Sequence, residues 1–244
     1  MYSIFFIGCG YIYITQSFIK DMGQLRNGLV SAILLFSVLP IIKREMFKFV
    51  FVVLLAFGIH AFSLIALPLY WLYPFFKRLK YSLIFLLVIL SIISFYGGVS
   101  DLILSVVGNS SFISEKIIHK LEGYSIKDVT SISIISITGF SYVLFSIFSI
   151  LNKERIENKS SVLTVFSMFH FYGVSLFLLF TGINTLNNRS LDLFSMTALP
   201  FLLITPLYFT KGISRVIFFM LIIVFCTLYF MAKINGLNLY ETVF

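Results

Sequence analysis

The sequence predicts an all-α fold: a polytopic integral membrane helical bundle with about seven full spans plus a re-entrant helical hairpin at residues 49–76. Hydrophobic residues make up 59% of the 244 residues and charged residues only 11%, which leaves too little polar surface for a soluble protein. The apolar runs are long and continuous, whereas the spans of a membrane barrel alternate over about ten residues. We therefore expect one transmembrane domain over residues 1–244.

Apolar elements follow one another along the chain, and we expect each of them except the third to cross the membrane once. They cover residues 2–19, 28–42, 49–76, 81–96, 131–151, 162–181, 193–210 and 216–231. As a straight helix the third element would be about 42 Å long, more than a hydrocarbon core of about 30 Å, yet two full crossings need roughly 40 residues. We therefore predict two half-helices that enter and leave on the same face, with a turn near Gly58 and His60.

The basic residues favour this hairpin, because cytoplasmic loops of membrane proteins carry an excess of lysine and arginine. With the hairpin, eleven of the 18 basic residues lie on the cytoplasmic side and seven on the outer side. With a single crossing, every later loop changes sides and the split becomes eight to ten. The hairpin thus places both basic groups that flank it, KREMFK before it and KRLK after it, in the cytoplasm.

Gly58, His60 and Ser63 lie at the predicted turn. Broken backbone at membrane depth is tolerated only where protein buries it or where it lines a watery cavity. We therefore expect this turn at the floor of a cavity that is open to the outer side. His170, near the middle of the sixth element, is a second intramembrane histidine, for which a functional role and a hydrogen-bonded packing role both stay open.

Two arginines precede apolar elements on the predicted outer side. Arg26 comes before the element at 28–42, and Arg189 comes before the element at 193–210. A guanidinium close to a helix N-terminus favours an anion such as a phosphate, because its charge and the backbone dipole act together. The alternative is that each arginine only anchors its helix at the lipid headgroups.

The extended polar region at residues 97–130 is predicted to be an extracytoplasmic loop with a short interfacial helix in SSFISEKIIHKLEGY. Lys116, Lys120 and Tyr124 would face a polar ligand at the membrane surface. The alternative is a helix that merely seals the top of the bundle. We expect no metal and no cofactor, because the sequence has no histidine pair with ligand spacing, no phosphate loop and no dinucleotide glycine pattern. The net charge of +8 reports orientation in a membrane, so we expect no nucleic-acid partner.

The stretch LRNGLVSAILLFSVLPIIKREMFKFVFVVLLAFGIHAFSLIAL, residues 25–67, resembles the EpsG-like branch of the Wzy O-antigen polymerase family. In that branch an outer arginine opens a span, a basic turn follows, and a helix is interrupted at a motif A-x-x-[FI]-H-x-[ST]-[SA]-L. The corresponding positions here are Arg26, Lys43, Arg44, Ala56, His60 and Ser63, and the later family positions are matched by Lys120, Leu121, Tyr124, Arg189 and Phe194. Relatives carry about four initial helices and an early outer loop, and we expect this chain to lack them.

The resemblance implies a membrane glycosyltransferase that polymerises O-antigen, capsule or exopolysaccharide at the outer face of the bacterial cytoplasmic membrane, in which it is a multi-pass protein. It would move a growing glycan from one undecaprenyl diphosphate carrier onto another lipid-linked repeat unit, without a cofactor. The partners implied are this lipid-linked oligosaccharide, membrane lipid and other polysaccharide assembly proteins.

The resemblance also implies roles for the candidate residues. Arg26 and Arg189 would hold the diphosphate, since a guanidinium offers fixed charge and paired donors to developing phosphate charge. His60 would activate or orient the acceptor hydroxyl, with Ser63 as its partner. The loop residues Lys116, Lys120 and Tyr124 would share contacts with the glycan or the diphosphate.

Two other function classes stay open. A flippase or transporter subunit for lipid-linked oligosaccharides would also use cations around a cavity, but it should need polar groups through the full membrane thickness. The inner halves of the predicted spans are almost uniformly apolar, which favours the polymerase. A catalytically silent scaffold would tolerate replacement of Arg26, His60 or Arg189.

Overall fold

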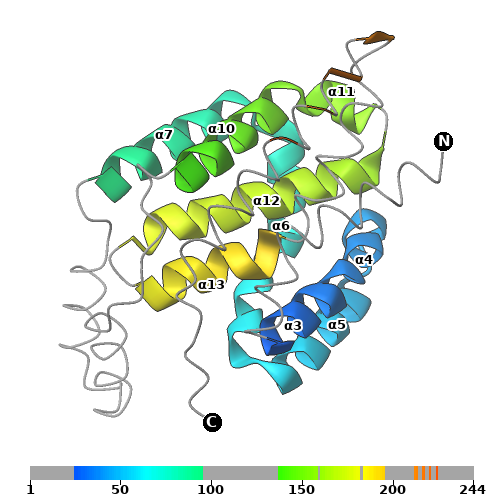
Figure 1. Ribbon diagram of the computed structural model, residues 1–244. Coiled ribbons are helices and arrows are strands. Elements are labelled where there is room, and N and C mark those ends of the chain that lie inside the picture. The colour runs from blue at the N-terminus through cyan, green and yellow to red at the C-terminus, as the bar shows by residue number, and fades with distance from the viewer. Residues whose placement is uncertain are drawn as a thin grey trace.

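The computed structural model describes residues 25–95, 137–158, 160–181 and 184–195, together with six single positions between 212 and 224 (Figure 1). These parts of the chain are helical and contain no strand. In chain order the elements are α3 (Leu25–Leu35), α4 (Val38–Lys43), α5 (Met46–Ile59), the 3₁₀ helix η2 (Ala61–Ala66), α6 (Leu69–Arg78), α7 (Tyr81–Phe95), α10 (Ile137–Leu151), α11 (Lys153–Glu157), α12 (Ser161–Leu179) and α13 (Asn184–Ser195).

Helix α12 is the centre of the described bundle. It packs against α4, α6, α7, α10, α11 and α13, and Figure 1 shows α7 and α10 on one side of it and α3, α5 and α13 on the other. Most of its side chains are buried, and a helix that is apolar all round needs such surroundings. Gly173 permits the close approach of α13, because a Cβ at this position would lie 2.7 Å from the Cβ of Phe194.

The surfaces that face away from α12 are strongly apolar. The exposed large hydrophobic side chains include Phe47, Phe51, Leu54 and Leu55 of α5, Phe85, Leu86, Ile92 and Phe95 of α7, and Phe140, Leu144 and Leu151 of α10. Exposed apolar stripes of this extent on several helices are unusual for a soluble monomer. They are suited to a hydrocarbon environment.

The count of spans predicted from the sequence is not confirmed by the described residues. Among them, α12 is the one helix that is long and apolar enough to cross a membrane, and the segments Ala61–Arg78 and Tyr81–Phe95, bent by 118°, form at most one more span. The predicted element at 2–19 and the predicted loop at 97–130 lie outside the described residues.

The second predicted element is longer than expected and is broken. It begins at Leu25 instead of residue 28, and a turn at Phe36 and Ser37 separates α3 from α4. The Ser37 hydroxyl donates to the carbonyl of Leu34 at 2.6 Å, and Pro40 has no N–H to offer to the carbonyl of Phe36. The break between α3 and α4 therefore has a local cause, which the pattern of apolar residues does not indicate.

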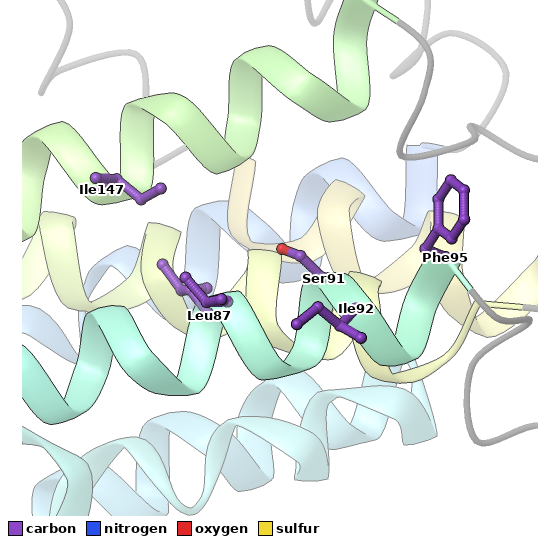
Figure 2. A pocket seen from close by; sticks show the side chains of 6 residues that line it. Leu87, Ser91, Ile92, Phe95 and Ile147 are labelled. Atoms are coloured by element: carbon purple, nitrogen blue, oxygen red, sulfur yellow. The ribbon is translucent and has the colours of Figure 1, made fainter.

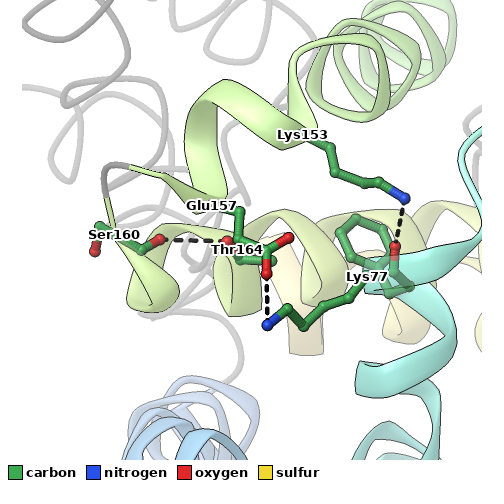
Figure 3. A network of polar contacts seen from close by, with 6 residues as sticks. Lys77, Lys153, Glu157, Ser160 and Thr164 are labelled. Atoms are coloured by element: carbon green, nitrogen blue, oxygen red, sulfur yellow. Dashed lines mark hydrogen bonds and ion pairs between the residues drawn. The ribbon is translucent and has the colours of Figure 1, made fainter.

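The basic residues of two turns and one short helix gather at one end of the bundle, which we call the basic end: the α4–α5 turn, the α6–α7 turn and helix α11. Lys77 and Lys80 form ion pairs with Glu157 and Glu154 of α11. The buried Lys153 donates from Nζ to the carbonyl of Phe76 at 3.0 Å, as Figure 3 shows. This carbonyl belongs to the last turn of α6, where helical acceptors have no partner within the helix.

Candidate functional site

The break in the predicted hairpin lies at His60. Helix α5 ends at Ile59, and His60 is extended, with φ −150° and ψ 119°. Its Nδ1 accepts a hydrogen bond from the backbone N–H of Phe62 at 3.1 Å and thereby caps η2. Because Nδ1 is an acceptor here, a neutral ring carries its proton on Nε2. The side chain therefore presents an N–H donor at its other nitrogen.

After the break, the chain turns back toward the basic end. The ring of Tyr70, near the start of α6, lies 5.4 Å from the ring of Phe49, near the start of α5. Arg44, at the α4–α5 turn, donates from Nη1 to the carbonyl of Tyr70 at 2.6 Å, and the Tyr70 hydroxyl donates to the carbonyl of Arg44 at 2.7 Å. The guanidinium also lies over the Tyr70 ring, 4.1 Å from its centre. We call this reciprocal contact the Arg44–Tyr70 clasp.

The clasp and the break together have the geometry of a helical hairpin. The 14 residues of α5 place His60 about 21 Å from the basic end along the helix axis. The return through η2 and α6 brings Tyr70 back beside Arg44. Both flanking basic groups lie at the basic end, as the charge pattern predicts for a hairpin.

Prolines explain two long-range contacts of the hairpin. Pro74 lies inside α6 and lacks the N–H that would pair with the carbonyl of Tyr70, and Arg44 supplies the donor in its place. Pro68 likewise lacks the N–H that would pair with the carbonyl of Ile65 in the 3₁₀ pattern, and the Tyr172 hydroxyl donates to that carbonyl at 2.8 Å. Each freed carbonyl is satisfied by a side chain from elsewhere.

Ser63 is fully buried next to the break. Its backbone N–H donates to the carbonyl of His60 at 3.0 Å. Its hydroxyl oxygen is buried and has no hydrogen-bond partner within the described part of the chain. A buried hydroxyl without a partner is unfavourable, which marks this position as a place where a water molecule or a ligand group would be stabilising.

Arg26 and Arg189 lie on two neighbouring helices at the end opposite the basic end. Helix α13 runs antiparallel to α12, since Asn187 donates to the carbonyl of Phe177 while Phe194 contacts Phe169. Helix α3 also runs antiparallel to α12, because its continuation α4 packs against α12 at the basic end. Helices α3 and α13 are therefore parallel to each other.

One contact fixes the register of α3 against α13: the Ser31 hydroxyl donates to the carbonyl of Leu193 at 3.0 Å. Arg26 is five residues before Ser31, and Arg189 is four residues before Leu193. At about 1.5 Å per residue, both positions lie roughly 6–8 Å beyond this contact, away from the basic end. Helix α5 packs against α3, so His60 lies at the same end as the two arginines.

Arg26 and Arg189 differ in where they lie along their helices as described. Arg26 is the second residue of α3. Arg189 is the sixth residue of α13, which begins at Asn184, well before the apolar run. The polar start of α13 is held by contacts that hydropathy does not detect, such as the Asn187 amide on Phe177 and the Ser190 hydroxyl on the carbonyl of Leu186. The helix dipole therefore does not support an anion at Arg189.

The remaining predicted residues divide into two groups. Lys116, Lys120 and Tyr124 lie outside the described residues. His170 is buried in α12, where its Nε2 lies 3.3 Å from the carbonyl of Tyr142 and its ring packs against the rings of Tyr142 and Phe145. These contacts favour the packing role of His170.

Sequence reasoning missed Tyr70 and Tyr172. Their hydroxyls bond to carbonyls 26 and 107 residues away. The available signal was the pair of prolines, because each proline in or near a helix leaves one carbonyl in need of a donor. That signal identifies the acceptor, but it does not identify the side chain that meets it.

An apolar groove of about 500 Å³ lies between α7 and α10 (Figure 2). It is lined by Leu87, Val88, Ser91, Ile92, Phe95 and Ile147. The buried hydroxyl oxygen of Ser91 has no hydrogen-bond partner within the described residues. Because α3, α5 and α13 lie on the other side of α12, this groove is separate from the elements that carry His60, Arg26 and Arg189.

The comparisons with known proteins give one match. The family model described as the EpsG family matches residues 1–242. No curated protein and no solved structure matches the chain. Since the family match spans nearly the whole sequence, it does not depend on the few polar motifs around His60. The chain belongs to the EpsG family.

Proposed function

We propose that the protein is a Wzy-type polysaccharide polymerase, a membrane glycosyltransferase that transfers glycan from one undecaprenyl diphosphate carrier onto a second lipid-linked repeat unit. The family supports a role in making surface polysaccharide. The observation that supports the proposal most is the break at His60, at the end of the described bundle from which α3 and α13, with Arg26 and Arg189, begin. Other polysaccharide assembly proteins are its proposed partners.

The proposed setting is the bacterial cytoplasmic membrane, crossed by about seven spans. The exposed apolar faces of α5, α7 and α10 support burial in hydrocarbon. The positive-inside rule assigns the basic end to the cytoplasm, because two basic turns and the basic residues of α11 gather there. The opposite end then faces outward, where lipid-linked glycans would be joined.

The proposed reaction forms one glycosidic bond and breaks one bond to phosphate. The acceptor hydroxyl oxygen attacks the anomeric carbon of the donor glycan, and the bond between this carbon and the diphosphate oxygen breaks with its electrons passing to the diphosphate. The hydroxyl proton is transferred to an oxygen of the departing diphosphate, which gains negative charge in this step. Arg26 and Arg189 would stabilise that charge by electrostatic contact.

The hydrogen bond at His60 narrows its role. Nδ1 accepts from the N–H of Phe62, so a neutral ring carries its proton on Nε2 and its basic nitrogen is already in a hydrogen bond. His60 would therefore orient the acceptor or donate to a phosphate oxygen, and would not act as a base. Ser63 would complete this part of the site, and the loop with Lys116, Lys120 and Tyr124 would contact the glycan.

Complementation of a polymerase-deficient bacterial strain tests the proposal, scored as the glycan ladder at matched membrane protein levels. We expect a ladder from the parent protein and a single repeat unit from Arg26→Ala, Arg189→Ala and His60→Ala. Lys48→Ala, at the basic end and with a side chain that is 71% exposed, is the control and should keep the ladder. Ladders from all three variants would contradict the site, and repeat units held on the cytoplasmic side would indicate a flippase.

A variant that keeps the cap separates the two tasks of His60. The side-chain oxygen of His60→Asn can accept from the N–H of Phe62 as Nδ1 does, since asparagine is a favoured capping residue. Its side chain is too short to place a donor where Nε2 lies. We expect His60→Asn to be as inactive as His60→Ala. A full ladder from His60→Asn would reduce His60 to a capping residue.

A further inference from the structure

Tyr172 of α12 contacts two of the elements that carry proposed site residues, η2 and α13. Its hydroxyl donates to the carbonyl of Ile65 in η2 at 2.8 Å. Its ring packs edge-on against the ring of Phe194 in α13, with 5.3 Å between the ring centres and 76° between the planes. One side chain thus joins the element that follows His60 to the helix that carries Arg189.

The Tyr172 hydroxyl supplies a hydrogen bond to η2 at a carbonyl for which the backbone of η2 has no donor. In a 3₁₀ helix the carbonyl of Ile65 would accept from the residue three positions later, and that residue is Pro68, which has no N–H. A carbonyl without a partner is strongly unfavourable in an apolar environment, so the Tyr172 hydroxyl stabilises this position of η2. His60 is the cap of the same 3₁₀ helix.

The contact between the rings of Tyr172 and Phe194 is held in a closely packed environment. Phe194 is buried between the rings of Tyr172 and Phe169, the latter 6.1 Å away. Gly173 lets the Phe194 backbone approach α12 so closely that an added Cβ would clash. The position of Tyr172 therefore sets the position of the C-terminal half of α13, and through that rigid helix the position of Arg189.

We propose that Tyr172 is a positioning residue, which fixes the His60 turn relative to the Arg189 helix; its catalytic consequence depends on the function proposed above. A reaction between two lipid-linked glycans requires the acceptor and the diphosphate in one fixed geometry. Misplacement by about 1 Å can lower a rate by roughly a hundredfold. Tyr172 would act on the rate through His60 and Arg189, without touching the substrate.

Tyr172→Phe is the direct test, because it removes the hydroxyl and keeps the ring. The matched control is Tyr70→Phe, which removes a hydroxyl that donates to a backbone carbonyl at 2.7 Å but lies in the clasp at the basic end. We expect Tyr172→Phe to lower the yield of long glycan by about tenfold or more, whereas Tyr70→Phe stays close to the parent at matched protein levels. Equal effects of the two variants would overturn the proposal.

Amide hydrogen exchange on the purified protein gives a readout that does not depend on polymerase activity. Tyr172→Phe should raise the exchange rate of residues 61–67 by about tenfold and leave residues 46–56 unchanged. Tyr172→Leu, which also loses the ring, should raise exchange in residues 190–195 as well. Unchanged exchange in both regions would overturn the positioning role, even if the parent protein forms no ladder and the proposed function is wrong.

A second substitution, at Pro68, tests whether Tyr172 positions the His60 turn or only supplies a hydrogen-bond donor to the carbonyl of Ile65. Pro68→Ala restores the N–H that can pair with the carbonyl of Ile65. In the Tyr172→Phe background we expect it to restore slow exchange in residues 61–67 but not the ladder, because the link from η2 to α12 is still missing. A ladder restored to the level of the Pro68→Ala single variant would show that Tyr172 only satisfies a carbonyl, and would overturn the proposal.

Discussion

The hairpin is held in the same way at two places, its base beside the basic end and its tip at the His60 turn. At each place a side chain donates to a carbonyl that a proline leaves without a partner, but the two donors differ in charge. At the base, Pro74 frees the carbonyl of Tyr70, and the guanidinium of Arg44 binds it at 2.6 Å. Near the tip, Pro68 frees the carbonyl of Ile65, and the neutral hydroxyl of Tyr172 binds it at 2.8 Å. A hydrogen bond from a charged donor is roughly twice as strong as one between neutral groups.

The partners also differ in where they come from. Arg44 belongs to the turn that begins the hairpin, so the base closes on itself. Tyr172 belongs to α12, so the tip depends on the rest of the bundle. The base of the hairpin is therefore held by contacts within the hairpin, whereas the His60 turn takes its position from the helices that surround the proposed site.

The largest effect on stability is expected at the base. Arg44→Ala leaves the carbonyl of Tyr70 without its donor and removes the cation–π contact, which together should lower the free energy of unfolding by roughly 2–4 kcal/mol. Chemical unfolding of the purified protein measures this change.

A second variant at the same position separates the side chain from the backbone. Arg44 has a φ of 61°, a left-handed conformation that glycine adopts without strain. Arg44→Gly should therefore be less destabilised than Arg44→Ala by about 1 kcal/mol. Equal stability of the parent, Arg44→Ala and Arg44→Gly would show that the clasp does not stabilise the hairpin.

Replacing two helical glycines by alanine should change the stability of the protein in opposite directions. Gly173→Ala places a Cβ 2.7 Å from the Cβ of Phe194 and should destabilise the protein by about 1–3 kcal/mol, because neither backbone can move freely. Gly58 in α5 has no atom within 4 Å of an added Cβ, so Gly58→Ala should stabilise it by about 0.5–1 kcal/mol. Thermal unfolding compares the two, and a neutral Gly173→Ala would contradict the close approach of α12 and α13.

The buried Lys153 predicts a dependence on pH. Burial lowers the pKa of Lys153, despite the nearby carboxylates of Glu157 and Glu154, which raise it. Between the folded and the unfolded pKa, the unfolded chain binds more protons, so the free energy of unfolding rises with pH in this window. Relative to Lys153→Met, the parent should gain stability as the pH rises toward the ordinary lysine pKa of about 10, whereas a difference that does not change with pH would contradict the burial of Lys153.

The smallest effect is expected for the exposed ion pair of the basic end. Lys48 of α5 and Glu45, the residue that precedes this helix, form an ion pair at 3.1 Å, and their side chains are 71% and 36% exposed. Exposed pairs of this kind contribute little, so Lys48→Ala should change the free energy of unfolding by less than about 0.5 kcal/mol. A loss as large as that of Arg44→Ala would mean that surface charge, and not the clasp, fixes the base.

The hairpin was predictable because its causes are local. The length of the apolar run at 49–76 excludes one straight span and two full spans, and the basic groups on both sides identify a shared end. The break at His60 was expected near that residue. The polar first half of α13 was not predictable as helix from hydropathy, since the Asn187 amide nitrogen and the Ser190 hydroxyl donate to carbonyls of the folded chain.

The side chains that bond to the hairpin could not be predicted from the sequence, and the reason is different. The contact between Tyr172 and Ile65 joins residues 107 positions apart, and any of the 13 tyrosines could in principle meet a freed carbonyl. Which of them does so depends on how α12 packs against η2. The register of Arg26 against Arg189 likewise follows from one contact, between Ser31 and Leu193, that has no signature in the sequence.

We propose that both flanks of the hairpin lie on the cytoplasmic side of the membrane and that its tip is reached from outside. Single cysteines at Lys48, Ala61 and Arg78, all exposed, test it in a background with Cys9→Ala and Cys226→Ala. A maleimide that cannot cross membranes is added to intact cells and, separately, to permeabilised ones. We predict labelling of Ala61→Cys in intact cells, and of Lys48→Cys and Arg78→Cys only after permeabilisation. Labelling of Lys48→Cys and Arg78→Cys from opposite sides would contradict the hairpin and the site built on it.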